Sequence, residues 1–357
     1  MPLRPEIRFC AAPDGVKLAV GSYGSGAPLV RAATWLTHVE HDATNPLTRH
    51  WCEELSRSHR YITYDGRGCG LSDRGPHDVS PEAWLSDLET VADAMGLARF
   101  PLVGLSMGAP IAVAYAVKHP DRVSRLVLVG GFHRSYFSSK NPDPRVLAEA
   151  DVLLKSARLG WGTGSAALRQ VFVAKLIGEA TEAQRQAFDE QQRVTSSPEM
   201  AERYLRAMFA LDVKDLAPRV ACPTLVFHSR GDQLIFFEQG RKLAAAIPGA
   251  RFVPLESKNH LPFPEEPAWH TFVAEAGAFL AAERASAGAP TAAPALTSRQ
   301  REVLRAVARG LADKEIAREL SLSPRTVEMH VARALAALEC ANRAQAVGKA
   351  KGLGILD

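Results

Sequence analysis

Cysteine and aromatic residues are scarce in this chain of 357 residues, which has five cysteines and 7% phenylalanine, tryptophan and tyrosine. The cysteines are scattered and odd in number, and no pair has the spacing of a metal site or of a redox motif. We therefore expect reduced thiols and a cytoplasmic protein. The first ten residues, MPLRPEIRFC, lack the apolar segment of a secretion signal, so we expect no secretion.

One uncharged stretch, residues 100–117, has about the length of a membrane span. It contains two prolines, two glycines and a serine, at Pro101, Gly104, Ser106, Gly108 and Pro110. This pattern favours a buried strand, a tight turn and a buried helix over one lipid-facing helix. We therefore predict no membrane partner.

The length of the chain and the distribution of its charge indicate two domains. A chain of 357 residues is too long for one compact core. Residues 296–357 hold 11 of the 43 Lys and Arg but only 7 of the 39 Asp and Glu, which leaves 32 of each sign in the rest. The whole net charge of +4 therefore belongs to the last domain. A local basic excess of this size is compatible with a polyanionic partner and does not prove one.

A segment of small residues and prolines, residues 285–295, reads as an Ala/Pro linker between domains 1–284 and 296–357. In the first domain, short apolar runs alternate with helix-like segments such as 81–95 and 110–118. The strand-like runs are residues 28–33, 60–65, 100–104, 125–130, 223–228 and 251–256. This alternation predicts an α/β fold, with a mostly parallel, doubly wound sheet. Residues from about 132 to 217 have helical patterning without clear strands, and we predict a helical lid there.

The pentapeptide Gly104-Leu105-Ser106-Met107-Gly108 follows a predicted buried strand and precedes a predicted helix. A serine on so sharp a turn needs small neighbours, because the strained backbone leaves no room for side chains beside it. An ordinary turn serine is the alternative, since the pattern also occurs by chance. The strand-turn-helix context favours a nucleophile.

A serine nucleophile needs a base, and the base needs a group that orients it. Asp232 comes just after the predicted strand 223–228, and His260 comes just after the predicted strand 251–256. The order serine, acid, histidine is typical of nucleophile-elbow hydrolases. Either residue alone is weak support, but all three follow strands and should meet at one sheet edge.

With these motifs, residues from about 7 to 283 resemble the α/β-hydrolase fold, through YDGRGCGLSD (64–73), VGLSMGA (103–109), SRGD (229–232) and NHLPF (259–263). The resemblance implies Ser106 as nucleophile, His260 as base and Asp232 as its partner. It also implies an oxyanion hole made by the backbone N–H of Met107 and by an N–H from the loop after residues 28–33.

That loop departs from the family pattern, because the chain has RAATWLTHVEHD where most members have a His-Gly pair. Thr34 or Trp35 remains to supply the second N–H, and the sequence leaves the choice open. Losing one oxyanion donor costs about a hundredfold or more in rate. A complete triad is therefore compatible with fast turnover, with slow turnover, or with a receptor that only binds.

Two further patterns resemble binding sites without predicting them. The glycine run 66–70 is not followed by a clear helix, and it fits a structural turn of the hydrolase fold better than a dinucleotide site. Residues 38–42, HVEHD, gather potential metal ligands, but no distant further ligand suggests itself. We predict no cofactor and no metal.

The last domain has a helix-turn-helix pattern. Thr297 or Ser298 can cap a helix that runs to about Arg309, residues 314–320 form a short second helix, and Ser323 and Pro324 start a third. Val327, Val331, Ala334, Leu335 and Leu338 form the apolar side of the third helix. A helical dimerisation module would share this composition, but the helix order is that of a DNA-binding domain whose last motif helix enters the major groove.

Residues 296–357 closely resemble the LuxR-type (NarL/FixJ-like) DNA-binding domain, through LTSRQREVLRAVARGL, KEIARELSLSPRTVEMHV and NRAQAV. The resemblance implies that Glu328, Met329 and Ala332 face base edges. It places Arg325, Thr326, His330, Arg333 and Lys314 near the DNA backbone. It also implies that the last helix pairs with a second copy, which would make a homodimer on paired half-sites.

Our leading hypothesis is a transcription regulator that senses a small molecule in the hydrolase-like domain and binds DNA through the last domain. The alternative is an active ester or lactone hydrolase with a regulatory DNA-binding tail, and a receptor without turnover is a third possibility. We expect a ligand that contains a carbonyl group. The apolar lid residues would line either a pocket or the core of the lid itself, and they are Trp161, Phe172, Phe188, Tyr204, Met208 and Phe209.

Overall fold

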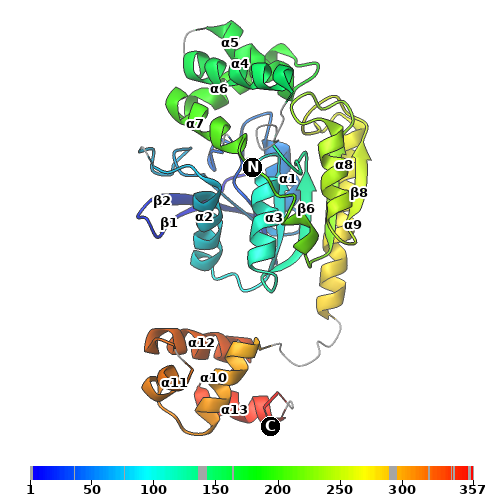
Figure 1. The fold of residues 1–357 in the computed structure, drawn as a ribbon. Helices are drawn as coiled ribbons and strands as arrows, with labels where there is room; N and C mark the ends of the chain where they lie inside the picture. The colour runs from blue at the N-terminus through cyan, green and yellow to red at the C-terminus, as the bar shows by residue number, and fades with distance from the viewer. Residues whose placement is uncertain are drawn as a thin grey trace. The chain divides into compact units, whose positions relative to one another are not determined.

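The first part of the chain forms an eight-stranded sheet (Figure 1). The computed structural model describes residues 3–35, 37–75, 77–135, 143–162, 165–288, 296–320, 322–338, 340, 342–352 and 355–356. The chain divides into two compact units, Met1–Glu283 and Arg284–Asp357.

The strands run in the spatial order β1-β2-β4-β3-β5-β6-β7-β8. They are β1 (Glu6–Ala11), β2 (Lys17–Tyr23), β3 (Pro28–Arg31), β4 (Arg60–Tyr64), β5 (Phe100–Leu105), β6 (Val123–Val129), β7 (Thr224–Ser229) and β8 (Arg251–Leu255). Pairs β1–β2 and β2–β4 are antiparallel, and every pair from β4 to β8 is parallel. The predicted mostly parallel sheet is confirmed, with an antiparallel hairpin added at one edge.

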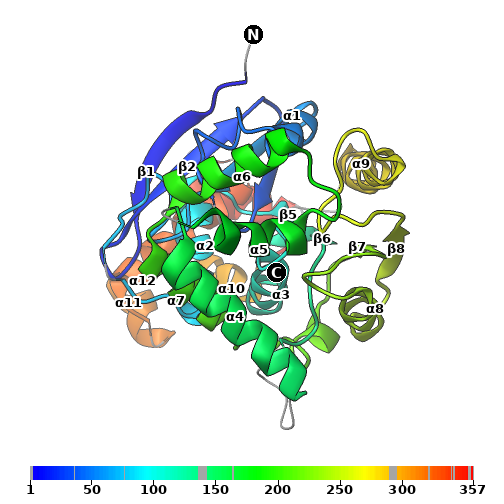
Figure 2. The same cartoon turned by 90° about the horizontal axis from the view of Figure 1, so that it is seen from above.

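Helices cover both faces of this sheet, so the predicted double winding is confirmed as well. On one face lie α1 (Arg49–Ser56) and α9 (Pro267–Gly288), whose apolar residues share a cluster with those of the central strands. On the other lie α2 (Pro81–Ala94), α3 (Gly108–Lys118) and α8 (Phe237–Ala246). Figure 2 shows α8 and α9 on opposite sides of β7 and β8.

Four helices rise over one edge of the sheet within the predicted lid interval (Figure 1). They are α4 (Pro144–Gly160), α5 (Ala166–Leu176), α6 (Glu182–Thr195) and α7 (Pro198–Met208), and a short 3₁₀ helix, η2 (Ala217–Arg219), follows them. Asp143, Thr181 and Ser197 cap α4, α6 and α7 through their side chains. Residues 136–142 and 163–164 of the interval lie outside the described residues.

The helix α9 continues to Gly288 and so includes the first residues of the predicted linker 285–295. Its last turns contain alanine and serine and meet no proline before Pro290, so nothing in the sequence forces the helix to end earlier. Residues 289–295 lie outside the described residues.

The second unit consists of α10 (Ser298–Ala308), α11 (Asp313–Glu319), α12 (Pro324–Ala337) and α13 (Arg343–Gly352). Thr297 and Gln300 form a capping box on α10, and Ser323 caps α12 ahead of Pro324. Val327, Val331, Ala334 and Leu338 of the predicted apolar side are buried. In the described part of the chain, no helix combines the length and the apolar character that crossing a membrane requires.

Candidate active site and nucleic-acid interface

Ser106 sits on a strained turn between β5 and α3. Its φ is +50°, and no other non-glycine residue of the described ranges has a positive φ. A Cβ on Gly104 would lie 2.6 Å from Cα of Ala109, and one on Gly108 would lie 3.0 Å from the carbonyl oxygen of Ala32. Gly104 therefore requires glycine, and Gly108 has little room for a side chain, which explains the pentapeptide. The Ser106 N–H donates to the carbonyl of Val129 at 2.8 Å and ties the turn to β6.

The loops after β7 and β8 bring an acid and a histidine together. Nδ1 of His260 lies 2.6 Å from Oδ2 of Asp232, and both side chains are buried. Nε2 of His260 is also buried, and no atom of a described residue is its hydrogen-bond partner. His260 and Ser106 line the same cavity.

The carboxyl group of Asp232 is held in its charged form. Burial by itself would raise its pKa, but the imidazoles of His260 and His228 outweigh burial and hold the pKa of Asp232 well below its usual range. Its other oxygen, Oδ1, accepts the backbone N–H groups of Leu234 and Ile235 at 2.9 and 3.0 Å. The acid is thus oriented from both oxygens.

Sequence reasoning missed His228, at the end of β7. Its Nε2 lies 2.7 Å from the carbonyl oxygen of Ile235 and 3.4 Å from Oδ2 of Asp232, so the ring fixes the loop that carries the acid. A Cβ on Gly240 would lie only 2.2 Å from its Nδ1. The available signal was a histidine that ends an otherwise apolar strand, four residues before the acid.

The backbone groups expected to form the oxyanion hole lie around Ser106. Met107 is buried at the N-terminus of α3, and Thr34 and Trp35 line the same cavity as Ser106. The carbonyl oxygens of Ala32 and Ala33 approach the start of α3, at 3.0 and 3.1 Å from the Cβ position of Gly108. The loop after β3 therefore lies directly against the serine turn.

The cavity above Ser106 has a volume of about 140 Å³ and is lined mainly by apolar side chains. Its roof comes from the lid, through Leu153, Phe172, Leu176, Ile177, Phe188, Leu205 and Met208. The expected lid residues divide between two roles. Phe172, Phe188 and Met208 line the cavity. The tilted ring of Trp161 packs against Trp35 at 4.8 Å between ring centres, and the Tyr204 hydroxyl donates to the carbonyl of Arg67 at 2.8 Å.

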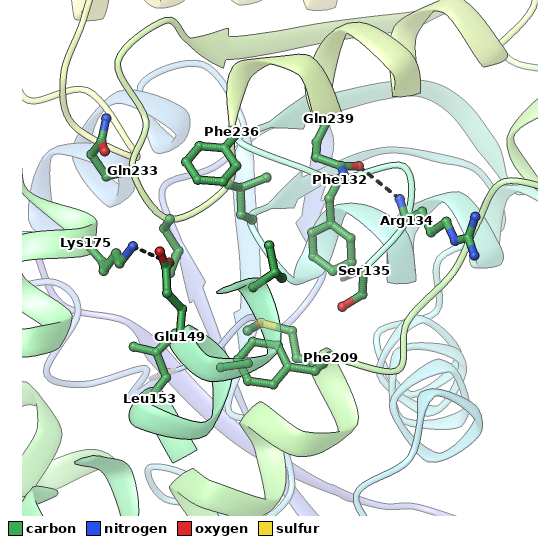
Figure 3. A pocket seen from close by; sticks show the side chains of 15 residues that line it. Phe132, Arg134, Ser135, Glu149, Leu153, Lys175, Phe209, Gln233, Phe236 and Gln239 are labelled. Carbon is green, nitrogen blue, oxygen red and sulfur yellow. Dashed lines mark hydrogen bonds and ion pairs between the residues drawn. The ribbon is translucent and has the colours of Figure 1, made fainter. Parts of the chain in front are cut away.

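A second cavity, of about 70 Å³, lies beside the first and shares Leu153, Met208 and Leu234 with it. Figure 3 shows Phe132, Phe209 and Phe236 around this cavity, with the ion pair of Lys175 and Glu149 at one side. Phe209 of the expected lid residues belongs here. Gln233, Leu234, Ile235 and Phe236, which directly follow Asp232, line this second cavity.

The two patterns that resembled binding sites are parts of loops. Nδ1 of His38 accepts the N–H of His41, and Asp42 pairs with Arg31. In the described ranges, no group of three or more potential ligand side chains is placed to hold a metal ion. The glycine run wraps around Asp65, whose Oδ2 would lie 2.1 Å from a Cβ on Gly70. It is a tight structural turn.

The residues expected to contact DNA cluster on α12 and the start of α11. Lys314, Arg325, Glu328, Met329, Ala332 and Arg333 are exposed, whereas Thr326 and His330 are half-buried. Thr326 shares a hydrogen bond of 2.7 Å with the capping Ser323. Burial and the charges of Arg333 and Arg299 lower the pKa of His330, which favours its neutral form.

Ion pairing separates the basic residues of this unit into two groups. Arg343 makes a bidentate pair with Asp313 at 2.6 and 2.8 Å, and Arg309 pairs with Glu319. Lys314, Arg325 and Arg333 form no ion pair with any residue that the structure describes. These three cations are therefore available to an external anion.

Comparisons with known proteins agree with this geometry. Residues 45–267 match the alpha/beta hydrolase fold family, and residues 294–350 match the luxR family of bacterial regulatory proteins. RutD of Caulobacter sp. (strain K31), which carries the name of a carbamate hydrolase, is 30% identical over 206 residues, or 56% of this chain and 72% of that protein. The 2-hydroxy-6-oxo-2,4-heptadienoate hydrolase of Pseudomonas putida (strain F1) is 28% identical over 252 residues, or 68% and 85% of the two chains.

A solved structure, the esterase EaEST from Exiguobacterium antarcticum, superposes with a TM-score of 0.66 at 25% identity, covering 76% of this chain and 98% of that one. The enol-lactonase from Burkholderia xenovorans LB400 superposes with a TM-score of 0.59 at 24% identity over 77% and 97% of the two chains, which shows the shared fold. The chain belongs to the α/β-hydrolase fold family, and a LuxR-type helix-turn-helix domain follows the hydrolase domain.

Proposed function

We propose that this protein is a DNA-binding regulator whose hydrolase domain binds a small carbonyl compound. The observation that carries the proposal is the presence, in one chain, of a serine turn with an oriented acid–histidine pair and of a LuxR-type domain. A chain with only the serine turn and the acid–histidine pair would be an ordinary hydrolase. A chain with only the LuxR-type domain would lack a sensor.

In the proposed chemistry, Oγ of Ser106 attacks the carbonyl carbon of an ester or lactone while Nε2 of His260 takes the hydroxyl proton. The N–H of Met107, with one from Thr34 or Trp35, would stabilise the negative oxygen that develops. The bond to the leaving alkoxide then breaks, and His260 returns the proton to it. Water repeats the sequence on the acyl-enzyme and frees Ser106, with Asp232 holding the histidine throughout.

In the proposed DNA complex, α12 enters the major groove. Glu328, Met329 and Ala332 would face base edges, where a carboxylate can accept from a cytosine amino group and a thioether can contact a thymine methyl. Lys314, Arg325 and Arg333 would contact phosphates, together with Thr326 and His330. We propose that α13 pairs two copies of the chain on paired half-sites.

The first test is covalent labelling of the purified protein by a fluorophosphonate, with Ser106→Ala as control. Labelling that depends on Ser106 is the expected result, because Asp232 orients His260, the base in the proposed chemistry. No labelling of folded protein would refute catalysis and leave a receptor domain.

The regulator proposal is tested by DNA binding. We expect sequence-selective binding that weakens steeply with salt, with a slope of log affinity against log salt of about −0.9 for each phosphate neutralised. Compounds that bind the hydrolase domain should change that affinity. Absence of selective DNA binding by a clean preparation would refute the proposal.

The second candidate is an active hydrolase whose tail only localises it. The oriented Asp232–His260 pair and the strained Ser106 favour it, as do the names of the matched relatives. Prompt ester turnover, together with a DNA affinity that no substrate changes, would select this candidate over the regulator.

A further inference from the structure

A buried ion pair lies in the wall of the Ser106 cavity. Arg31, at the end of the central strand β3, contacts Asp42 with Nη2 and Oδ2 3.1 Å apart. The two residues are 3% and 2% exposed, and both line the cavity that Ser106 and His260 line. Burying two charges in a strand end is costly unless their hydrogen bonds are complete.

The hydrogen bonds of this pair are incomplete. Nη2 of Arg31 also donates to the Thr63 hydroxyl at 2.7 Å, but Nε of Arg31 is buried and has no partner among the described residues. Oδ1 of Asp42 is likewise buried without such a partner. Two residues that line the cavity therefore keep one donor and one acceptor without a partner among the described residues.

A second buried pair shows what a purely structural contact looks like in this fold. Arg67 and Asp87 form two parallel hydrogen bonds, at 2.9 and 2.6 Å. The remaining nitrogen of Arg67 donates to the carboxylate of Asp14 and to the carbonyl of Asp78. The pair is bidentate and complete, and it does not line the Ser106 cavity.

We propose that Arg31 and Asp42 bind a neutral polar group of the ligand that both donates and accepts a hydrogen bond, such as a hydroxyl or a carboxamide. This inference rests on the proposed function, because it places the carbonyl of the same ligand at Ser106. The two charges cancel within the pair, so an anionic group would meet Asp42 as well as Arg31. A neutral group satisfies both leftover atoms.

The size of the cavity limits the rest of the ligand. Its volume of about 140 Å³ is close to the roughly 150 Å³ of an engineered cavity that holds benzene. A long acyl chain would not fit without displacing the lid. The inferred ligand is therefore a compact ester or lactone that carries a hydroxyl or amide at the end remote from the carbonyl.

The experiment compares matched methyl esters that differ only in the polar group. One pair is methyl 3-hydroxypropanoate and methyl butanoate, and a longer pair is methyl 6-hydroxyhexanoate and methyl heptanoate. Methyl hydrogen succinate supplies an anionic probe. Binding is measured by calorimetry in the Ser106→Ala variant, so the readout does not require catalysis. Turnover is measured separately in the unmodified protein.

In at least one pair, we expect the hydroxy ester to bind at least about tenfold more tightly than its methyl-ended partner, because the latter leaves both buried atoms unpaired. The anionic probe should bind less well than the hydroxy ester. Equal or weaker binding of the hydroxy ester in both pairs would overturn the inference.

The double variant Arg31→Leu with Asp42→Leu tests whether these two residues cause the preference for the hydroxy ester. Replacing both members of a buried ion pair by apolar side chains often leaves stability unchanged. The hydroxyl preference should disappear in it, and a preference that survives would overturn the inference. If the double variant does not fold, Arg31→Lys keeps the charge but removes Nε, and it should reduce the preference. Phe172→Leu is the control, since it should change the binding of both esters in a pair alike.

The outcomes separate this inference from the proposed function. A hydroxyl preference without fluorophosphonate labelling would mean that the recognition is right and the catalysis wrong. Labelling and turnover without the hydroxyl preference would mean that the catalysis is right and the recognition wrong.

Discussion

Replacing the acid by its amide, Asp232→Asn, should abolish serine reactivity while keeping the loop in place. In the native protein, Oδ2 of Asp232 accepts from Nδ1 of His260 at 2.6 Å, and this contact fixes the proton on Nδ1. The asparagine oxygen can still accept from the N–H groups of Leu234 and Ile235. Its amide nitrogen then faces His260 as a donor.

This reversal changes the tautomer of the histidine. Nδ1 must now accept, so the ring proton moves to Nε2, the atom that should take the proton of Ser106. In a serine protease the same exchange of aspartate for asparagine lowers kcat by about 10⁴-fold, which corresponds to about 5 kcal/mol in the barrier. We expect a loss of that order here. The free energy of unfolding should fall by only about 1–3 kcal/mol, the cost of one disturbed buried hydrogen bond.

The assay is the rate of fluorophosphonate labelling at pH 8, followed by ester turnover where a substrate is found. Thermal unfolding of the same samples reports whether the loop is intact. The neighbouring Gln233→Ala serves as control, because Gln233 contacts the carbonyl of Gly231 and not the histidine. Labelling of Asp232→Asn within about tenfold of the native rate would refute the tautomer argument.

Four further outcomes follow from the same structure. Gly104→Ala should give little labelled protein, because its Cβ would lie 2.6 Å from Cα of Ala109; normal labelling would contradict the turn geometry. Ser323→Ala should lower the stability of the last domain by about 0.5–2 kcal/mol in thermal unfolding, since it removes the cap of α12. In a binding-site selection, Glu328→Ala should change the ranking of DNA sites, whereas Lys314→Ala should keep the ranking and make the salt slope shallower by about one. Because the folded pKa of Asp232 lies below its unfolded value, its contribution to stability should be present above pH 3.8 and be lost as the pH falls below it, as acid unfolding can check against Asp232→Asn.

Local patterns made much of this structure predictable. The serine turn is specified largely by local sequence, because a Cβ on Gly104 would lie 2.6 Å from Cα of the nearby Ala109. The last domain is specified by its caps, since Thr297 and Ser323 begin helices at the predicted positions. In both cases the deciding interactions join residues close in sequence, which is why the sequence alone carries them.

The edge hairpin β1–β2 could not be predicted in the same way. β1 is mostly exposed and carries charged residues, and β2 contains Gly21 and Ser22, so neither forms a continuous apolar run. Their register is fixed by pairing with each other and with β4. The hairpin becomes visible only once the sheet that it extends is known.

Several contacts of the candidate site could not be predicted, because they join separate elements of the fold. Arg31 interrupts a strand pattern, and its pairing with Asp42 depends on a loop that no periodicity describes. The lid is tied in the same manner to the loop that carries His260, because the backbone N–H of His260 donates to the carbonyl of Leu176 at 2.9 Å. The side chain of Asn259 accepts the N–H of Gly178 at 3.0 Å.

These lid contacts bear on how a ligand could be sensed. The end of α5 both lines the Ser106 cavity, through Leu176, and holds the backbone of His260. Under the proposed function, a ligand that displaces Leu176 would shift or strain the loop that carries His260, since the two residues share a hydrogen bond. This contact would then couple ligand binding to the reactivity of His260.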